Sequence, residues 1–316
     1  MTTRDASLVA SFTTALSAAT DAAGSQNYPP ATLYLLATPI GNLADISLRA
    51  LHLLQLADVI ACEDSRHSQA LLRAYGIHKP ASQWLAVHQH NEAQAVQTVL
   101  DRLNQGQRVV YVSDAGTPAI SDPGARLVAG VRQADLLVVP VPGASSVTAI
   151  LSVAGIVADA QQHGAFVFAG FLPSKAGERA SAIAALSTEM RPVVLLEAPH
   201  RIEALALAVA VLGQRQLTVG RELTKQFEEI TTLAAAGLPD WLAQDANRTR
   251  GEFALVLHPP VLVPDRLPDT RVLTLLLAEL PLKTAVKLAA EITGAPRNVL
   301  YQQALAIKAE QATTAD

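Results

Sequence analysis

The chain has 316 residues, of which 50% are hydrophobic and 16% charged, and its formal net charge at pH 7 is −4. This length is enough for two domains and a small appendage. The mild negative charge excludes a protein that is basic throughout, but it permits a local basic patch. The one cysteine, Cys62, excludes an intrachain disulfide; we expect it to be a small buried residue in a cytoplasmic protein. No apolar stretch is long enough to span a membrane, so we expect no membrane association.

The beginning of the chain, residues 1–31, is rich in Ala, Ser and Thr. Its apolar run is broken, unlike the core of a secretory signal. We therefore predict a disordered or frayed N-terminal arm.

A short apolar run, residues 109–112, precedes a loop of turn-forming residues. The run predicts a strand buried on both faces, as in a parallel sheet. The loop carries the Asp114 carboxylate and the hydroxyls of Ser113, Thr117 and Ser121. Ligands bind at the carboxyl ends of strands in open α/β sheets, so this loop is a candidate site for a small polar ligand. A tight strand-to-helix connection without a ligand is the alternative.

Three further strand-and-loop pairs give residues 32–146 the pattern of a doubly wound α/β domain. The strands are expected at residues 33–37, 58–62 and 136–140, followed by loops at 38–43, 63–67 and 141–146. Pro39 and Gly41 shape the first loop, but no G-x-G-x-x-G sequence follows its strand. The sequence therefore does not predict a dinucleotide site.

Ionisable side chains gather after two of these strands. Residues 63–67 include four of them, which are costly to bury unless paired. This favours a polar wall of an active cleft over a capped helix start. A His-x-His sequence at His88 and His90 has no further ligands at a recognisable spacing, so we interpret it as a helix start with Asn91 as cap and expect no metal.

The second half of the chain is expected to hold a linker, residues 147–163, and a second α/β domain, residues 164–260. Strands are predicted at residues 166–170, 192–196, 217–219 and 251–257. Four cations follow these strands: Lys175, Arg201, Arg221 and Lys225. One such cation would be an ordinary surface charge, but their common position predicts an anionic partner that faces the cleft.

The last part of the chain, residues 265–316, changes from βα alternation to helices alone. Helices are predicted at residues 273–280, 283–292 and 299–308. Between residues 281 and 308 there are four cations, Lys283, Lys287, Arg297 and Lys308, against one acid, Glu291. Such helices are typical of a helix-turn-helix and also of a structural cap.

Seven motifs occur in a fixed order between about residues 32 and 310. They are TPIGNL at 38–43, EDSR at 63–66, HQHNE at 88–92, VSDAGTP at 112–118, FLPSK at 171–175, APHR at 198–201 and GRELTK at 220–225. With these motifs the chain resembles the bacterial 16S rRNA cytidine 2′-O-methyltransferases of the decoding site. That family belongs to the tetrapyrrole-methylase superfamily, which comprises class III S-adenosylmethionine-dependent methyltransferases.

The resemblance implies two α/β domains with a cofactor cleft between them, a small C-terminal helical module that docks RNA, and a homodimer. It implies S-adenosylmethionine as cofactor and 16S rRNA or the small ribosomal subunit as partner. The cofactor-binding residues that it implies are Pro39, Gly41, Asp114, Gly116, Thr117, Pro118, Ser121, Ala144, Ser145, Glu197 and Arg221. The tetrapyrrole members have a G-x-G-P-G-D type of first loop, and the different sequence at residues 38–42 favours the rRNA branch.

A ribose 2′-OH is a weak nucleophile, so a base would assist methyl transfer, whereas no metal is required. The candidates for the base are Glu63, Asp64, His90 and Glu222. The candidates for RNA binding are Arg66, Lys175, Arg201, Lys225, Lys283, Lys287 and Arg297. Two alternatives are a methyltransferase of small molecules such as tetrapyrroles and a non-catalytic RNA-binding protein.

Overall fold

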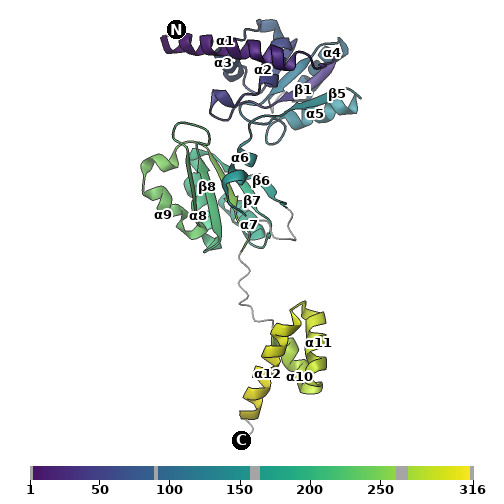
Figure 1. The fold of residues 1–316 in the computed structure, drawn as a ribbon, viewed down its shortest axis with the longest axis vertical. Helices are drawn as coiled ribbons and strands as arrows, with labels where there is room; N and C mark the ends of the chain where they lie inside the picture. Colours follow the sequence, from purple (N-terminus) through teal and green to yellow (C-terminus); the bar gives the residue numbers. More distant parts are fainter. Residues whose placement is uncertain (1–2, 89–91, 157–163, 261–269, 314–316) are drawn as a thin grey trace. The chain divides into compact units, whose positions relative to one another are not determined.

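The computed structural model describes residues 3–88, 92–156, 164–260 and 270–313, with side chains from residue 12 to residue 308 (Figure 1). Contacts divide the chain into two units, Met1–Pro260 and Val261–Asp316. None of the described helices is long and apolar enough to cross a membrane.

The first sheet of the larger unit is parallel throughout, in the order β3-β2-β4-β1-β5. Its strands are β1 (Thr32–Leu36), β2 (Val59–Cys62), β3 (Trp84–Ala86), β4 (Val109–Val112) and β5 (Leu137–Val141). Every residue of the central strand β4 is buried, as the apolar run predicted. Cys62 ends β2 and is also fully buried, and burial raises the pKa of its thiol to about 11. The thiol is therefore protonated at neutral pH, as expected for a packing residue.

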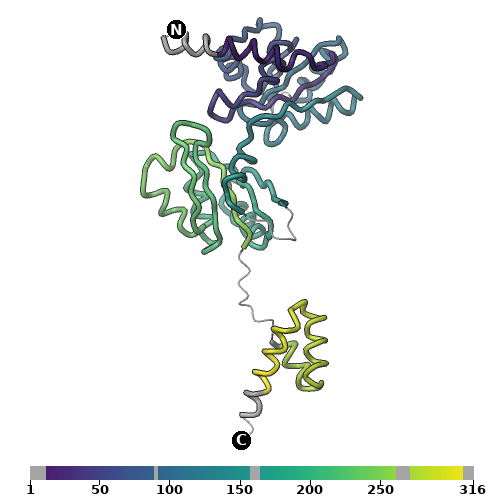
Figure 2. Tube along the Cα trace, viewed as in Figure 1, coloured from purple at the N-terminus to yellow at the C-terminus, as the bar shows by residue number. Residues whose placement is uncertain are grey.

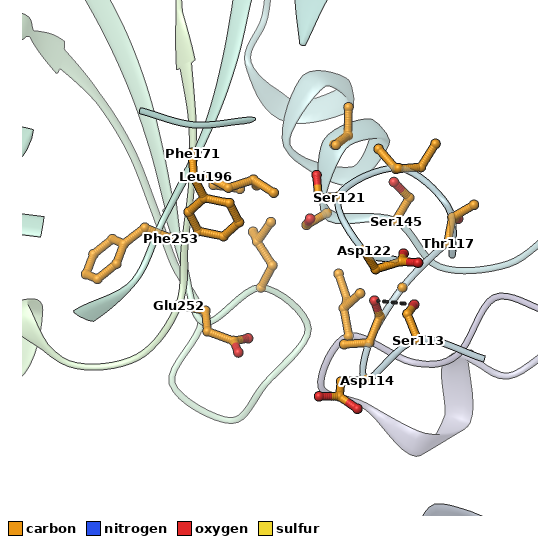
Figure 3. Close-up of a pocket in the computed structure, with 18 of the residues that line it drawn as sticks. Ser113, Asp114, Thr117, Ser121, Asp122, Ser145, Phe171, Leu196, Glu252 and Phe253 are labelled. Atoms are coloured by element: carbon orange, nitrogen blue, oxygen red, sulfur yellow. Dashed lines mark hydrogen bonds between the residues drawn. The ribbon is translucent and has the colours of Figure 1, made fainter. Parts of the chain in front are cut away.

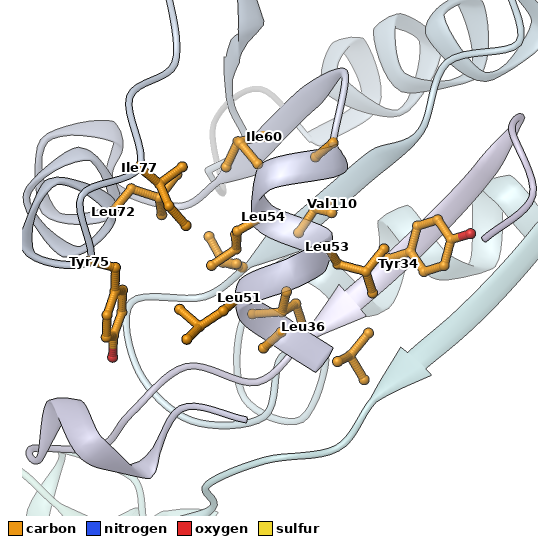
Figure 4. Close-up of a cluster of buried hydrophobic side chains, with 14 of the residues drawn as sticks. Tyr34, Leu36, Leu51, Leu53, Leu54, Ile60, Leu72, Tyr75, Ile77 and Val110 are labelled. Atoms are coloured by element: carbon orange, nitrogen blue, oxygen red, sulfur yellow. The ribbon is translucent and has the colours of Figure 1, made fainter. Parts of the chain in front are cut away.

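Helices cover both faces of this sheet: α2 (Leu48–Leu56), α3 (Ser65–Ala74), α4 (Glu92–Asn104) and α5 (Gly124–Gln133). Alternate residues of β4 belong to different cores because successive side chains of a strand point to opposite faces. Val110 and Val112 join the core formed with α2 and α3 (Figure 4), whereas Val109 and Tyr111 join the core formed with α4 and α5. The two cores hold the sheet in place, so its loops project from a rigid edge.

The prediction of a disordered arm over residues 1–31 is wrong, because helix α1 spans Thr3–Ala23. Figures 1 and 2 show α1 lying beside α2. Phe12 packs edge-on against Tyr75 of the core at 4.9 Å between ring centroids, and Ala19 is fully buried. Phe12, Leu16, Ala19 and Ala23 recur at the spacing of one helix face. Two of these four residues are alanine, so the apolar face of the helix does not stand out in the sequence.

The second sheet has the order β6-β7-β10-β8-β9 and is mixed. Its strands are β6 (Val167–Phe171), β7 (Val193–Glu197), β8 (Gln216–Arg221), β9 (Glu229–Ala234) and β10 (Phe253–Leu257). Only β6 and β7 pair in parallel; β10 runs antiparallel to β7 and β8, and β9 antiparallel to β8. No strand was predicted at β9, because its residues alternate between exposed and partly buried and form no continuous apolar run. Residues 222–228 are instead the turn of a hairpin.

The predicted linker, residues 147–163, starts with a helix-like sequence, and the helix α6 (Ser146–Val153) lies there. α6 packs on the second sheet, so this part belongs to the second domain rather than to a linker. Ile150 of this helix is fully buried. A Cβ at Gly220 would lie 2.6 Å from the Ile150 Cδ1, so α6 approaches β8 as closely as a glycine allows. Residues 157–163 lie outside the described residues. The remaining helices of the domain are α7 (Ala176–Leu186), α8 (Ile202–Val209) and α9 (Leu238–Ala243).

Short 3-10 helices punctuate the larger unit at Leu43–Asp45, Ala81–Gln83, Pro199–Arg201, Ala210–Leu212, Ala235–Gly237 and Ala246–Thr249. The smaller unit consists of α10 (Thr270–Glu279), α11 (Leu282–Thr293) and α12 (Arg297–Thr313), as the sequence predicted. These helices enclose a core of their own, formed by Leu273, Leu277, Ala285, Val286, Ala289, Leu300 and Ala304.

Candidate functional site

A cavity of about 410 Å³ lies at the carboxyl ends of the strands of the first sheet and takes in residues of both α/β domains (Figure 3). Polar side chains from the loop after β4, with Ser145, form one side, and Figure 3 shows them facing Phe171 and Leu196 across the cavity. The apolar lining residues are Ile40, Ala115, Ile120, Val147, Phe168, Phe171, Leu196, Ala198, Pro199, Leu223, Phe253 and Ala254. The cavity therefore suits a ligand that carries both polar groups and an apolar part.

The charge of the cavity lining is entirely negative. Its carboxylates are Glu63, Asp114, Asp122, Glu197 and Glu252, and no Lys, Arg or His is among the described lining residues. Burial raises the pKa of Glu63, and the nearby Asp114 and Asp122 raise it further. Repulsion between the carboxylates is relieved by a cation, so the lining favours a positively charged ligand.

The loop after β4 is held to neighbouring loops by its backbone. Thr38 and Gly116 form an antiparallel bridge in which each N–H donates to the other residue's carbonyl at 3.0 Å. The Thr117 hydroxyl donates to the Ala144 carbonyl at 3.1 Å. The loops after β1, β4 and β5 therefore form one rigid wall, which explains why residues distant in sequence share a site.

Glu197 is the most deeply buried carboxylate of the lining, with 2% of its surface exposed. Its Oε1 lies 3.0 Å from the Arg201 Nε and accepts a hydrogen bond from the Ala198 N–H. Its Oε2 has no hydrogen-bond partner among the described residues. A buried carboxylate oxygen without a partner is costly, so this atom is suited to a polar ligand in the cavity.

Arg201 donates to the Leu172 carbonyl as well as pairing with Glu197. Arg221 pairs with Glu229 at 3.4 Å, and it donates to the carbonyls of Phe227 and Arg250. Both guanidiniums are thus held by partners inside the domain. Internal carboxylates and carbonyls thus pair with both guanidiniums, which the sequence did not predict. An anionic partner for them stays a prediction.

Lys225 has internal partners too: its Nζ donates to Glu222 at 2.7 Å and to Glu252 at 3.1 Å. Burial alone would raise the pKa of Glu222, but hydrogen bonds from Lys225 and the Glu252 N–H outweigh it and lower that pKa. A Cβ at Gly41 would lie 2.3 Å from the Lys225 Cγ, so Gly41 is needed for close packing of these loops. Glu222 is engaged and lies outside the lining, which disfavours it as a base.

The structure divides the residues expected from the resemblance. Asp114, Gly116, Thr117, Ser121, Ser145 and Glu197 line the cavity, and Glu63 does so among the base candidates. Pro39, Gly41, Pro118, Ala144 and Arg221 are not lining residues. Gly41 packs against Lys225, the Ala144 carbonyl accepts from Thr117 and Arg221 pairs with Glu229. Asp64 caps α3 by accepting from the Arg66 N–H, and His90 lies outside the described residues.

The remaining RNA candidates are at the surface. Arg66 is 90% exposed beside Asp64, and Lys175 is 80% exposed beside Glu178. Lys283 and Lys287 are exposed one helical turn apart on α11, whereas Arg297 pairs with Glu291 at 3.4 Å.

Sequence reasoning missed several lining residues. Asp122 lies in the loop that was singled out, but nothing in the local sequence distinguishes it from Asp114. Glu252 falls within the strand predicted at residues 251–257 rather than after it; it lies just before β10 and reaches the cavity because β10 runs antiparallel. Phe168 lies in a predicted strand, and Phe171 opens the FLPSK motif without a role assigned to it; the exposed fraction of Phe171, 52%, is the feature that sets it apart.

Comparisons with known proteins agree with this geometry. The profile described as "Tetrapyrrole (Corrin/Porphyrin) Methylases" matches residues 32–238, and the profile "RsmI C-terminal HTH domain" matches residues 268–308. A "Ribosomal RNA small subunit methyltransferase I" of Pseudomonas aeruginosa is 47% identical and aligns over 87% of this chain and 96% of its own length. The protein of the same name in Escherichia coli O157:H7 is 44% identical, over 86% and 94% respectively.

The fold is also similar to solved structures. A cobalt precorrin-4 methyltransferase of cobalamin biosynthesis superimposes with a TM-score of 0.52 at 22% identity, over 72% of this chain and 95% of that one. At this identity the likeness concerns the fold. From the matches to both profiles and to these relatives, the chain belongs to the ribosomal RNA small subunit methyltransferase I family within the tetrapyrrole (corrin/porphyrin) methylases.

Proposed function

We propose that this protein transfers a methyl group from S-adenosylmethionine to the ribose 2′-OH of a decoding-site cytidine in 16S rRNA. The observation that carries the proposal is the carboxylate-lined cavity in a chain of this family. The rRNA substrate follows the names of the relatives, and the 2′-OH of cytidine follows the resemblance of the ordered motifs.

The cavity suits S-adenosylmethionine on each of its three chemical features. Asp114 and the hydroxyls of Thr117, Ser121 and Ser145 can bond to a ribose and to polar groups of an adenine. The apolar side can hold the flat ring. The carboxylates offset the positive sulfonium and ammonium groups, and the Glu197 Oε2 has capacity for an ammonium donor.

The methyl donor supplies a carbon already activated by its bond to a positive sulfur. The protein then has to hold the acceptor oxygen in line with that bond and to receive its proton. In the transfer the C–S bond breaks, a C–O bond forms and the 2′-OH proton passes to a base. Glu63 is the candidate that lies in the cavity lining, and its raised pKa makes it a stronger proton acceptor than an ordinary glutamate.

The substrate is 16S rRNA, either free or in the small ribosomal subunit, and a homodimer is the working form expected from the resemblance. The exposed Lys283 and Lys287 of the C-terminal unit are suited to phosphate contacts, and so is Arg66 beside the cavity.

The test is a map of 2′-O-methylation on 16S rRNA from cells with and without this chain, followed by methylation of unmodified small subunits with the purified protein. A methyl group that disappears in the deletion strain and returns in vitro supports the proposal. Transfer to a tetrapyrrole but not to rRNA would contradict it. Binding of the cofactor and the subunit without turnover would instead identify a non-catalytic RNA-binding protein.

A further inference from the structure

A second cavity, of about 240 Å³, lies on the first α/β domain outside the cofactor site. Its lining residues are Gln69, Arg73, Ile77, His78, Lys79, Ala81 and Trp84. Gln69 and Arg73 come from α3, and Trp84 comes from β3, which is the edge strand of the first sheet. The lining combines cationic groups, amide and imidazole groups and one aromatic ring, whereas the first cavity is lined by carboxylates.

The sequence around this cavity is distinctly basic. Residues 65–91 contain Arg66, Arg73 and Lys79, four of the chain's eight histidines and no Asp or Glu, in a chain whose net charge is −4. Arg66 pairs with Asp64 just before this range, whereas Arg73 has no carboxylate partner among the described residues. The excess of cations around Arg73 attracts an anion.

The donors at the mouth of this second cavity are available. Arg73 and His78 are exposed, and neither side chain has a hydrogen-bond or ion-pair partner in the part of the chain that the structure describes. Lys79 differs, since its Nζ caps the end of α2 by donating to the carbonyls of Gln55 and Ala57. Lys79 therefore adds positive charge, while Arg73 and His78 remain to bind a ligand.

Trp84 offers a half-exposed ring whose position is fixed. Its Nε1 donates to the Lys79 carbonyl at 3.3 Å, and the ring also packs against the core of the first domain. A fixed aromatic ring next to arginine is the combination on which unpaired nucleobases stack in proteins that bind single-stranded RNA.

Helix α3 links the second cavity to the first. Glu63 lines the first cavity, Asp64 caps the start of α3, and Arg73 lines the second cavity near its end. Arg66 and Arg73 are two turns apart and share one face of the helix. A ten-residue helix is about 15 Å long, a length that a few nucleotides of a single strand can follow.

We propose that this second cavity binds a nucleotide of the single-stranded RNA that flanks the methylated residue, with its base on Trp84 and its phosphate at Arg73. The proposal rests on the proposed rRNA methyltransferase function. Arg66 would hold an intermediate phosphate, so that α3 sets how far along the strand the target nucleotide enters the first cavity.

The experiment measures binding of the full-length protein to unmethylated small ribosomal subunits over a range of salt concentrations. Arg73→Ala is expected to weaken binding several-fold and to reduce the salt slope by about one, since one phosphate contact is lost. Affinity for S-adenosylmethionine should not change. Arg132→Ala is the matched control, because Arg132 is an exposed arginine on α5, in neither cavity. Equal affinity and equal salt slope for wild type and Arg73→Ala would overturn the proposal.

A second measurement follows the Trp84 ring. The chain has two tryptophans, and Trp241 is buried in the second domain. A short single-stranded RNA oligonucleotide should quench the fluorescence of the Trp241→Phe variant, in which Trp84 is the remaining tryptophan, and should not quench that of Trp84→Phe. Absence of quenching in Trp241→Phe would contradict stacking on Trp84 even if Trp84→Phe failed to fold.

These outcomes separate the second cavity from the proposed function. If the wild type methylates subunits and Arg73→Ala binds them normally, the function stands and the second cavity does not bind RNA. If the wild type does not methylate subunits but Arg73→Ala binds them more weakly, the proposed reaction fails and the RNA site stands.

Discussion

Asp114 and Asp122 line the same cavity, but Asp122 alone is tied to the loop by three hydrogen bonds. Its carboxylate accepts from the Tyr111 hydroxyl at 3.0 Å and from the N–H groups of Ala119 and Gly124 at 2.8 Å each. Asp114 accepts from the Asp64 N–H at 3.2 Å and is otherwise exposed. The Asp122 carboxylate therefore holds the loop, whereas the exposed Asp114 carboxylate is left to contact a ligand in the proposed function.

Asp114→Ala should weaken S-adenosylmethionine binding by at least tenfold and leave the melting temperature nearly unchanged, because its carboxylate has few internal partners. Asp122→Ala should lower the free energy of unfolding by about 1–3 kcal/mol, because the Tyr111 hydroxyl and the N–H groups of Ala119 and Gly124 lose their acceptor. Calorimetry and thermal unfolding on both variants check this. Unchanged cofactor affinity in Asp114→Ala would remove Asp114 from the binding site.

Gly116→Ala should cost stability and cofactor affinity together. Gly116 has φ of +77°, where a side chain costs about 1–2 kcal/mol, and a Cβ there would lie 3.3 Å from the Ile40 Cγ2. Gly106→Ala is the matched control, with φ of +79° and open space around its Cβ. Both variants should melt earlier, and Gly116→Ala alone should bind S-adenosylmethionine more weakly. Equal affinity in the two would show that the Gly116 contact does not shape the cavity.

The sequence predicts four of the five strands in each sheet, because these strands are short apolar runs. The missed strands, β3 and β9, each lie at an edge of their sheet. β3 has only three residues, all partly buried, and β9 alternates between exposed and partly buried residues, so neither has the buried apolar run of a central strand. Helix α1 was missed because much of its buried face is alanine, which is also common in disordered segments.

The sequence predicted the polar residues of the candidate site, but it did not predict the ion pairs that the neighbouring cations form. Residues such as Asp114 and Ser121 follow a strand, and strand ends meet at one edge of the sheet. Lys225 pairs with Glu222 in the hairpin turn and with Glu252 beside the antiparallel strand β10, and no local pattern reveals that strand direction. Arg201 pairs with Glu197 at the end of β7, four residues earlier in the chain. Cations at strand ends therefore had the expected position but different partners.

Arg201→Ala should destabilise the fold rather than weaken phosphate binding. Removal of the guanidinium leaves the Glu197 carboxylate buried without its countercharge, which costs about 3 kcal/mol. Arg66→Ala is the comparison, since that exposed arginine should leave the melting temperature nearly unchanged while reducing the salt slope of RNA binding. A stable Arg201→Ala protein with a reduced salt slope would restore Arg201 as an RNA contact.

S-adenosylmethionine binding should weaken as pH falls through the raised pKa of Glu63. Burial and then Asp114 and Asp122 raise this pKa, so protonation begins above the range of an ordinary glutamate, about pH 4.3. The protonated form has no charge with which to attract a sulfonium, so affinity is highest above this pKa. S-adenosylhomocysteine, with a neutral sulfur, should show a smaller pH dependence, and Glu63→Gln should flatten the difference. Calorimetric titrations of both ligands at a series of pH values test this prediction. Identical pH dependence of the two affinities would exclude Glu63 as a partner of the positive sulfur.

Truncation after Pro260 should separate RNA docking from cofactor binding. Helices α10, α11 and α12 enclose their own core, and the contacts of the chain divide at this position. The remaining unit, Met1–Pro260, contains both sheets and every residue that lines the first cavity. We therefore expect this unit to unfold at the same temperature as it does in the full-length protein, and to keep its affinity for S-adenosylmethionine.

Methylation of small subunits by the truncated protein should fall at least tenfold, because the exposed Lys283 and Lys287 are lost with α11. The full-length Lys283→Glu, Lys287→Glu variant should show the same loss with an intact C-terminal core, since both side chains point away from that core. A structural cap gives the opposite pattern, in which truncation lowers the melting temperature and the cofactor affinity together while the charge-reversal variant methylates normally. Thermal unfolding, calorimetry and a methylation assay on the two proteins distinguish the roles.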